Sequence, residues 1–382
     1  MNGAISGIKI EPKSSRTFPL TQIYFYLTKG CNLRCRHCWI QPEFEEGASR
    51  YPALDIASFR QCIEEALPLG LKGVKLTGGE PFLHPKIFDI LEHIREKKLS
   101  LTVETNAVLC TAEIVQAIIA CKNPFVAVSL DGPDAQIHEW VRQVKGSFEG
   151  ALRGIRMLVG AGLRPQMIMS VMRHNKDEEC LRAAVKLAES IGAGSVKFNF
   201  VMPMARGEML AMDGGTIPAS EVLPLGAWIE NELAKESSIS LMTNLPVAFR
   251  SLRKMYGAYG IGCHRCTVFN IIGVLGDGSY ALCGIGATVP ELIFGRVGED
   301  RLADIWEQSP VLNHLRAHLP QDLEGVCRRC IMKYLCLGTC VALNYYREKK
   351  LLAANWVCQE AYDSGSFPGS RLNNPAAFTA MH

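Results

Sequence analysis

K-G-C-N-L-R-C-R-H-C-W, residues 29–39, places three cysteines, Cys31, Cys35 and Cys38, within eight residues. This C-x3-C-x2-C spacing lets one irregular loop direct all three thiolates at a single metal centre. A closed structural site normally uses four protein ligands, so three ligands leave one coordination position free. Residues 22–28 are rich in β-branched and aromatic side chains, which predicts a strand and puts the cysteines on a βα loop. The pattern favours an open iron on a cubane cluster, with a zinc loop or scattered core thiols as the alternatives.

The triad after a first strand resembles the signature of radical S-adenosylmethionine (radical SAM) enzymes. In that family the free iron chelates the methionine end of SAM, and one electron from the cluster cleaves a C–S bond. The resulting 5′-deoxyadenosyl radical abstracts a substrate hydrogen, while the protein positions and shields the reactants. The resemblance implies that His37, where relatives often have an aromatic residue, packs by the adenine.

Bulk composition excludes several other classes of protein. The 382 residues exceed what one compact core usually takes, so we expect two domains or a large barrel with an appendage. A net charge of +3, from 41 basic and 38 acidic residues, gives no dominant field for nucleic acid. We find no apolar run long enough for a bilayer and no secretion signal. We therefore expect a soluble, cytoplasmic protein with neither a nucleic-acid nor a membrane partner.

Fifteen cysteines are a further signal, because disulfides are disfavoured in a reducing compartment and clustered thiols there bind metal. Eight of them fall between residues 263 and 358. Four others stand alone and are expected to be buried core residues: Cys62, Cys110, Cys121 and Cys180.

Residues 20–200 alternate short apolar runs with amphipathic stretches. The predicted strands are 22–28, 73–77, 100–104, 125–130, 166–172 and 195–200, and the predicted helices are 56–67, 85–96, 112–120, 148–159 and 178–190. Six βα repeats indicate an α/β fold, a partial (β/α)6 TIM-like barrel with helices outside a parallel sheet. In such barrels ligands bind where the strands end.

Unusual residues gather at those strand ends. The second strand runs into T-G-G-E-P, residues 77–81, where two glycines let the backbone approach a ligand; an ordinary turn is the alternative. The resemblance implies that Gly78, Gly79 and Glu80 bind the SAM amino group. It also implies that Ser129 and Arg142 contact the SAM ribose and carboxylate, although Arg142 could instead be a solvated helix residue.

One departure follows the third strand, where the family's Thr-Asn-Gly reads Thr105-Asn106-Ala107. The change removes a permissive glycine but keeps the polar pair.

The last third of the chain is organised by cysteines. Glycines and prolines at 203–220 mark a boundary, and residues 222–236 predict a linking helix. The C-x2-C pair at 263, the G-x4-C ending at 283 and the C-x2-C-x5-C-x3-C from 327 resemble the SPASM domain, which carries two auxiliary iron–sulfur clusters; zinc ribbons are the alternative. The resemblance implies interleaved ligation, by Cys263, Cys266, Cys283 and Cys340 for one cluster and by Cys327, Cys330, Cys336 and Cys358 for the other.

These patterns predict five segments. They are an N-terminal extension (1–19), a radical SAM partial barrel (20–215), a linking helical segment (216–255), a small cysteine-rich SPASM domain (256–362) and a flexible tail (363–382).

The resemblance implies SAM and three [4Fe–4S] clusters as cofactors, and a flavodoxin or ferredoxin-type electron donor. Most SPASM relatives modify peptides or proteins by crosslinking, epimerisation or oxidation. Gly284 stands where the sulfatase-maturating relatives have an aspartate base, which argues against formylglycine formation. About 20 residues precede the first strand, so recognition of a leader peptide would require a separate protein. We expect a peptide or protein maturase; the alternatives are a radical SAM enzyme acting on a small molecule or tetrapyrrole, and a zinc-binding scaffold without catalysis.

Overall fold

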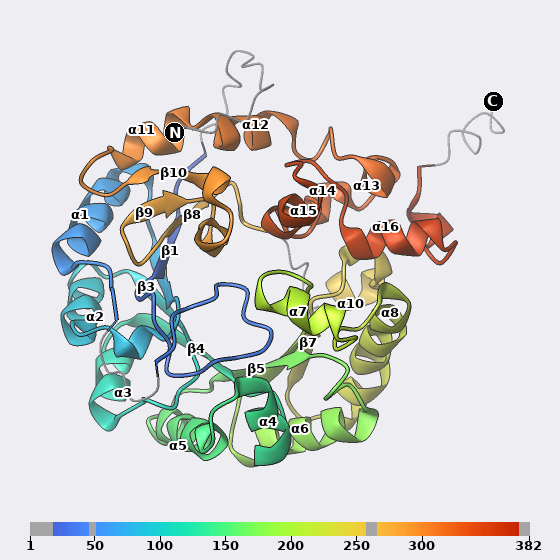
Figure 1. Cartoon of the computed structure of the whole chain (residues 1–382), viewed down its shortest axis with the longest axis horizontal. Coiled ribbons are helices and arrows are strands. Elements are labelled where there is room, and N and C mark those ends of the chain that lie inside the picture. Colours follow the sequence, from blue (N-terminus) through green and yellow to red (C-terminus); the bar gives the residue numbers. More distant parts are fainter. Residues whose placement is uncertain (1–17, 46–50, 257–265, 374–382) are drawn as a thin grey trace.

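The computed structural model describes residues 18–45, 51–256 and 266–373. They contain one ten-stranded sheet in the order β10-β9-β8-β1-β2-β3-β4-β5-β6-β7 (Figure 1). Strand β8 and strands β1 to β7 run parallel, whereas β9 and β10 are antiparallel additions at one edge. The strands are β1 (Gln22–Tyr26), β2 (Gly73–Thr77), β3 (Ser100–Thr105), β4 (Lys122–Ser129), β5 (Gln166–Val171), β6 (Ser195–Phe200), β7 (Ser240–Thr243), β8 (Ile271–Val274), β9 (Ser279–Ala281) and β10 (Ile293–Arg296).

Helices surround the sheet along the perimeter of the molecule (Figure 1). Those of the first 240 residues are α1 (Ile56–Ala66), α2 (Ile87–Glu96), α3 (Ala112–Ile119), α4 (Ala135–Arg142), α5 (Ser147–Gly160), α6 (Glu178–Ser190), α7 (Arg206–Met212), α8 (Ala219–Trp228) and α9 (Ala234–Glu236). Several begin at side-chain caps, because Asp55, Thr111 and Asp134 each accept a hydrogen bond from a backbone N–H in the first turn.

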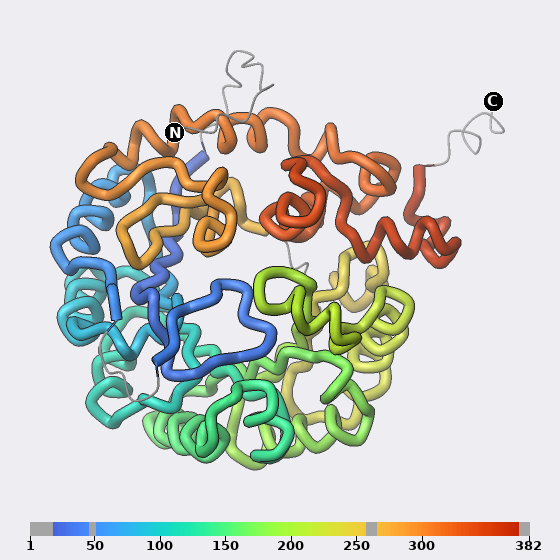
Figure 2. Tube along the Cα trace, viewed as in Figure 1, coloured from blue at the N-terminus to red at the C-terminus, as the bar shows by residue number. Residues whose placement is uncertain are grey.

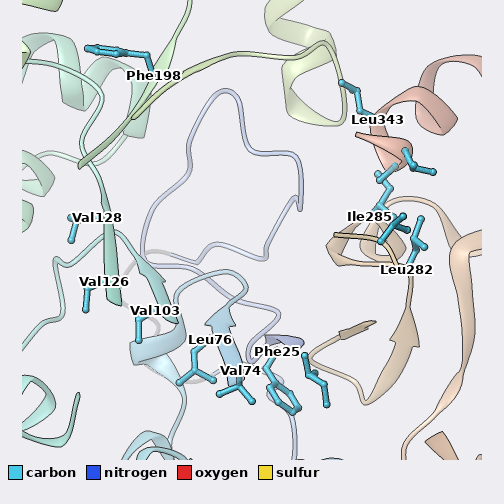
Figure 3. Packing of buried hydrophobic residues seen from close by; sticks show 14 of the residues in the cluster. Phe25, Val74, Leu76, Val103, Val126, Val128, Phe198, Leu282, Ile285 and Leu343 are labelled. Atoms are coloured by element: carbon cyan, nitrogen blue, oxygen red, sulfur yellow. The ribbon is translucent and has the colours of Figure 1, made fainter. Parts of the chain in front are cut away.

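The core lies between the sheet and these helices. Alternate strand residues such as Phe25, Val74, Leu76 and Val103 are fully buried and pack side by side across neighbouring strands (Figure 3). Since side chains alternate between the faces of a strand, the residues between them point to the inner face of the curved sheet. That inner face carries polar side chains, and it is where the site described below is built.

The predicted α/β partial barrel is confirmed, and the six predicted strands and five predicted helices are present within a few residues of their expected bounds. Two further parallel strands were not predicted. β7 pairs with β6 inside the predicted linking segment, and β8 pairs with β1 from the cysteine-rich region. Each has only four residues, too short for a clear periodic signal. Figure 2 shows the orange C-terminal trace beside the blue first strand, so the last third of the chain extends the same sheet.

The predicted linking helix at 222–236 is interrupted. After α8 the chain makes a π-helical turn, Ile229–Leu233, before the short α9. This turn includes the buried Glu230, which forms an ion pair of 3.0 Å with the fully buried Arg250. The buried Glu230–Arg250 ion pair thus lies where the helix changes from an α-helical to a π-helical turn.

The remainder of the chain is made of short elements. Its helices are α10 (Leu252–Tyr256), α11 (Leu302–Gln308), α12 (Pro310–His318), α13 (Gly325–Arg329), α14 (Lys333–Cys336), α15 (Val341–Glu348) and α16 (Trp356–Asp363). Residues 364–373 of the predicted tail fold back onto this region, where Ile331 N–H donates to the Arg371 carbonyl at 2.9 Å. Within the described ranges, no helix is both long and apolar enough to cross a membrane.

Candidate active site

The loop after β1 brings Cys31, Cys35 and Cys38 together. Cys31 and Cys35 are buried and Cys38 is half-buried. Burial raises the pKa of the Cys31 thiol, and the neighbouring Cys35, Glu80 and Cys38 raise it further. Burial and neighbouring thiols oppose the ionisation of Cys31 and Cys35, and a positively charged metal centre, which binds thiolates, would relieve this cost.

The three cysteines suit an iron–sulfur cluster because of their sulfur donors. They do not converge closely enough to bind one metal ion directly. Among the described residues, no three Cys, His, Asp or Glu side chains approach as closely as direct ligation of one ion requires. In a cubane cluster each cysteine binds a different iron, so the thiols do not have to meet at one atom. The soft, all-sulfur donor set of the triad suits iron in such a cluster.

Helix α4 fixes the second half of this loop. The last carbonyls of a helix lack partners within the helix. Here the carbonyls of Val141 and Arg142 accept from the backbone N–H groups of Arg36 and Arg34, at 3.0 and 3.1 Å. The conformation of the cysteine loop is therefore set by a regular element that follows β4.

The turn after β2 supports the first half of the loop. The N–H of Glu80 donates to the Gly30 carbonyl at 3.1 Å, and that of Gly79 to the Thr28 carbonyl at 3.3 Å. A Cβ added at Gly79 would lie 1.8 Å from the Gly30 oxygen, and Gly78 has a φ of +129°. Both glycines therefore permit a close approach of two backbones, next to Cys31.

The Glu80 side chain is fully buried and joins two segments. Its Oε1 accepts from the Thr105 hydroxyl at 2.7 Å and from Phe82 N–H at 3.2 Å, and its Oε2 accepts from Asn106 N–H at 2.8 Å. Burial raises the pKa of Glu80 to about 7, against the lowering effect of these hydrogen bonds. The carboxylate thus ties the end of β3 to the glycine turn, a role that the sequence alone did not indicate.

Two further residues of the β3 end take part. Asn106 Nδ2 donates to Asn32 Oδ1 at 2.8 Å, inside the cysteine loop. Ala107, where the family's glycine is expected, is fully buried with a φ of +60°. The backbone keeps the left-handed conformation that glycine would adopt without strain.

Arg142 is buried at the end of α4 and is held by Asp131. Its Nε lies 2.7 Å from Asp131 Oδ2, and its Nη1 donates to Cys35 Sγ at 3.3 Å. Burial would raise the pKa of the fully buried Asp131, but Arg142 and the nearby histidines hold it below its usual range. Arg142 is therefore a buried neighbour of the cysteine site and not a solvated helix residue, and its side chain already contacts a carboxylate of the chain itself. Its role as a SAM contact stays a prediction.

His37 lies close to this ion pair. Burial lowers the pKa of His37 to about 4, with Asp131 opposing the change and Arg142 adding to it. The ring is consequently neutral at ordinary pH, and its Nδ1 has no hydrogen-bond partner in the described part of the chain.

Ser129, the last residue of β4, faces the inner side and is half-buried. Backbone register places it opposite Ile168 of β5, which in turn lies opposite Lys197 of β6. No other described residue hydrogen-bonds the Ser129 hydroxyl, so this group is available to a ligand.

A group of charged residues on the inner face was not predicted. Lys75 of β2 forms an ion pair of 2.8 Å with Glu104 of β3, and its ammonium lies 4.2 Å from the centre of the Tyr24 ring. Lys197 is also directed to this face, since Val196 and Phe198 are buried on the other. Charged residues at alternate positions of otherwise buried strands are the signal that could have identified them.

Tyr26 packs beside Gly284, the position that the sequence resemblance matched to the aspartate base of sulfatase-maturating enzymes. A Cβ at Gly284 would lie 2.3 Å from the Tyr26 ring. Burial raises the pKa of Tyr26, and the nearby Cys283 and Glu104 raise it further. Glycine is therefore required here by packing, and a phenol fills the place of a longer side chain.

The C-terminal cysteines form two groups. Burial raises the pKa of Cys283, as do Cys340 and Cys266. Burial and the other three thiols of its group likewise raise the pKa of Cys358, and one small cavity is lined by all four of them: Cys327, Cys330, Cys336 and Cys358. Cys263 lies outside the described residues. The described thiols thus lie near one another in two groups, and their assignment to two clusters stays a prediction.

Comparison with family models gives two matches. The model described as the radical SAM superfamily matches residues 25–188, and the SPASM model, an iron–sulfur cluster-binding domain, matches residues 263–331.

Among curated relatives, the AdoMet-dependent heme synthase of Methanosarcina barkeri is 30% identical over 331 residues, which cover 83% of this chain and 90% of the relative. The mycofactocin maturase MftC of Mycobacterium ulcerans is 27% identical over 354 residues, covering 90% and 89%. Both alignments therefore extend over most of this chain and most of the relative.

A solved structure of SuiB from Streptococcus suis, bound to precursor peptide SuiA, superposes with a TM-score of 0.68 at 17% identity over 90% of this chain and 76% of SuiB. The structure of anSMEcpe with bound AdoMet gives 0.68 at 18% identity over 94% and 100%. At these identities the superpositions establish a common fold.

Proposed function

Because this chain belongs to the radical SAM superfamily and carries a SPASM iron–sulfur region, we propose that it cleaves SAM reductively and abstracts hydrogen from a peptide or protein side chain. The modification of that side chain would be a crosslink, an epimerisation or an oxidation. The observation that carries the choice of a peptide is the polar inner face of the sheet, described below.

Cys31, Cys35 and Cys38 would hold the SAM-binding cluster. When bound, this cluster and SAM supply the electron and the organic radical that make abstraction from an unreactive carbon possible. The chain's own part is to orient and to exclude water. Gly78, Gly79, Glu80, Ser129 and Arg142 remain our assigned SAM contacts, with His37 beside the adenine.

Two closed sets of four cysteines would hold auxiliary [4Fe–4S] clusters, giving three clusters in all. Cys263 completes the first of these sets in the proposal. If both sets are complete, each auxiliary iron has a protein thiolate, so the auxiliary sites serve electron transfer and architecture and do not bind substrate directly.

The inner face of the sheet suits a peptide. Its exposed and half-buried side chains include Tyr24, Lys75, Glu104, Ser129 and Lys197, which offer donors, acceptors and both charges. A peptide presents amide groups and short side chains to such a surface. A flat macrocycle presents a large apolar area, and the polar residues that lie under its apolar face would lose their hydration without compensation.

A second candidate is a tetrapyrrole or another small molecule. The observation that favours it is the 30% identity to an AdoMet-dependent heme synthase across most of both chains. Peripheral carboxylates of a tetrapyrrole could also meet the lysines of the inner face. The zinc scaffold has no comparable support.

Partners follow from the same proposal. A flavodoxin or ferredoxin-type protein would deliver the electron to the cysteine loop. A separate leader-binding protein would assist recognition if the peptide substrate carries a leader.

The test uses cluster-loaded protein without oxygen, with SAM and a reductant. Short peptides encoded beside the gene and tetrapyrrole carboxylic acids are offered separately, and products are followed by mass spectrometry together with 5′-deoxyadenosine. A mass change in a peptide that depends on Cys35 supports the proposal. A change confined to the tetrapyrrole would replace it with the second candidate.

A further inference from the structure

The positive charges on the inner face of the sheet outnumber the negative charges. Lys75 is fully engaged, with Glu104 at 2.8 Å and the Tyr24 ring at 4.2 Å. Its pKa would be lowered by burial, but Glu104 and Tyr24 raise it, so this ammonium stays charged. Glu104 also acts electrostatically on Lys197, so the two lysines share this carboxylate.

Lys197 has no ion-pair partner of its own. Within the described part of the chain, no acceptor lies within hydrogen-bond or ion-pair distance of its ammonium. Burial lowers its pKa; Glu104 opposes the change, while Lys75 and Arg250 add to it. Arg250 is itself committed to Glu230 at 3.0 Å. Two lysines therefore face one carboxylate, and one positive charge is left over.

Lys197 also lies at the same height in the sheet as Ser129, near which the reaction is expected. Register aligns Ser129, Ile168 and Lys197 across β4, β5 and β6, so Lys197 lies two strands, roughly 10 Å, from the assigned SAM contact Ser129. A partly buried ammonium without a protein acceptor must be satisfied by water or by a ligand, and a ligand carboxylate would also neutralise its charge.

We propose that Lys197, backed by the Lys75–Glu104 pair, binds a carboxylate of the substrate, and that in a peptide this is an Asp or Glu side chain close to the residue that reacts. The inference rests on the proposed function and deepens it. The bound carboxylate neutralises the excess charge and holds the peptide at the level of Ser129.

A competing role for such a lysine is compensation of an auxiliary cluster. Lys75 does interact with the charge of Cys283, but Lys197 has no comparable interaction with a cysteine among the described residues. Lys197 is consequently the residue whose substitution separates the two roles.

The first experiment needs no identified substrate. Cluster-loaded protein with SAM is treated with acetic anhydride, and acetylation of Lys197 is measured by mass spectrometry in propionate or in uncharged propionamide at equal ionic strength. We expect propionate to slow the labelling of Lys197 severalfold and propionamide to have no effect. Lys186, exposed on the outside of α6, provides the internal control. Equal labelling of Lys197 in both solutions would overturn the carboxylate site.

The second experiment uses a peptide that the protein modifies, with its acidic residue present or changed to the amide. Lys197→Met should raise KM for the acidic peptide by about tenfold or more, because a hydrogen bond to a charged group is lost. Lys197→Arg should recover part of this, and Lys186→Met should leave KM unchanged. The amide peptide should lose affinity with the wild type and lose little more with Lys197→Met.

Controls of folding are the melting temperature and iron content of each variant. If Lys197→Met shifts an auxiliary-cluster spectrum and raises KM equally for both peptides, the lysine serves the cluster and the inference is wrong. If propionate protects Lys197 while no peptide is modified, the peptide function fails and the carboxylate site stands. If peptides are modified but propionate gives no protection, the peptide function stands and the carboxylate site fails.

Discussion

The two cysteine regions of the molecule are held in different ways. The triad loop is tied by backbone hydrogen bonds to the ends of β1 and β2 and to the last carbonyls of α4. Most of the C-terminal cysteines lie on or beside helices of four to eight residues, such as α13 and α14. Helices this short have little stability of their own.

This difference indicates how much the structure of each region depends on metal binding. The triad region is a preformed loop on a rigid sheet, and in the proposed function its cluster keeps one iron open. The C-terminal region has to gain much of its stability from ligation, because cluster binding and folding are coupled where regular structure is sparse. The predictions below test this contrast, beginning with the largest effect.

Removing one cysteine from each region should have opposite consequences. Cys35→Ala should abolish 5′-deoxyadenosine formation while the protein stays folded and keeps about eight of about twelve iron atoms. Cys358→Ala should instead lose local order across α13 to α16, seen as faster hydrogen exchange there than in β1 to β6. Formation of 5′-deoxyadenosine by Cys35→Ala would refute the assignment of the open site.

A substitution at Gly79 should disrupt the conformation of the triad loop. A methyl group at this position collides with the Gly30 carbonyl, so Gly79→Ala should cost about 3 kcal/mol or more and release iron from the triad. Gly160→Ala at the end of α5 meets no atom within 4 Å and serves as the matched control. Thermal unfolding and iron content measure both. Equal stability of the two variants would mean that the loop yields easily.

Glu80 should contribute less, and in a manner that depends on pH. Glu80→Gln disturbs three hydrogen bonds and should cost about 1 to 3 kcal/mol. The pKa of Glu80 is raised to about 7 in the folded protein, so its contribution is greatest at low pH and is lost as the pH rises through that value. Melting temperatures of the wild type should fall between about pH 5 and pH 7 and level off above that, while those of the variant should stay flatter. Parallel curves would exclude this role for the carboxyl group.

The smallest effect is expected at Ala107. Ala107→Gly relieves a residue with a φ of +60° but removes a buried methyl group and adds freedom to the unfolded chain, so stability should change by less than about 1 kcal/mol. Ala107→Val should be clearly destabilising, because a branched side chain resists this conformation. Denaturant unfolding distinguishes them; similar losses for both would point to packing and not to backbone strain.

Much of the fold could be predicted because its signals are local. Alternating apolar runs define β1 to β6, and the cysteine spacings define both metal regions. β7 and β8 were not predicted because they have four residues each and are recognisable only by their pairing with distant strands.

The candidate site was harder to predict for a related reason. The sequence indicated that Glu80 and Arg142 lie near the triad, but their contacts with Thr105, Asn106 and Asp131 join segments far apart in the chain. Lys75, Glu104 and Lys197 come from three strands and become a group only when the sheet curves. Tertiary register, which no short motif encodes, assembles them.

The division into one open and two closed cluster sites is tested most directly by electron paramagnetic resonance. The reduced, cluster-loaded wild type is measured with and without SAM, beside the variant lacking Cys31, Cys35 and Cys38. We expect three cluster signals in the wild type, of which SAM alters one, and two signals insensitive to SAM in the variant. A SAM-dependent change that survives in the variant, or a wild-type spectrum that SAM leaves unaltered, would contradict this division.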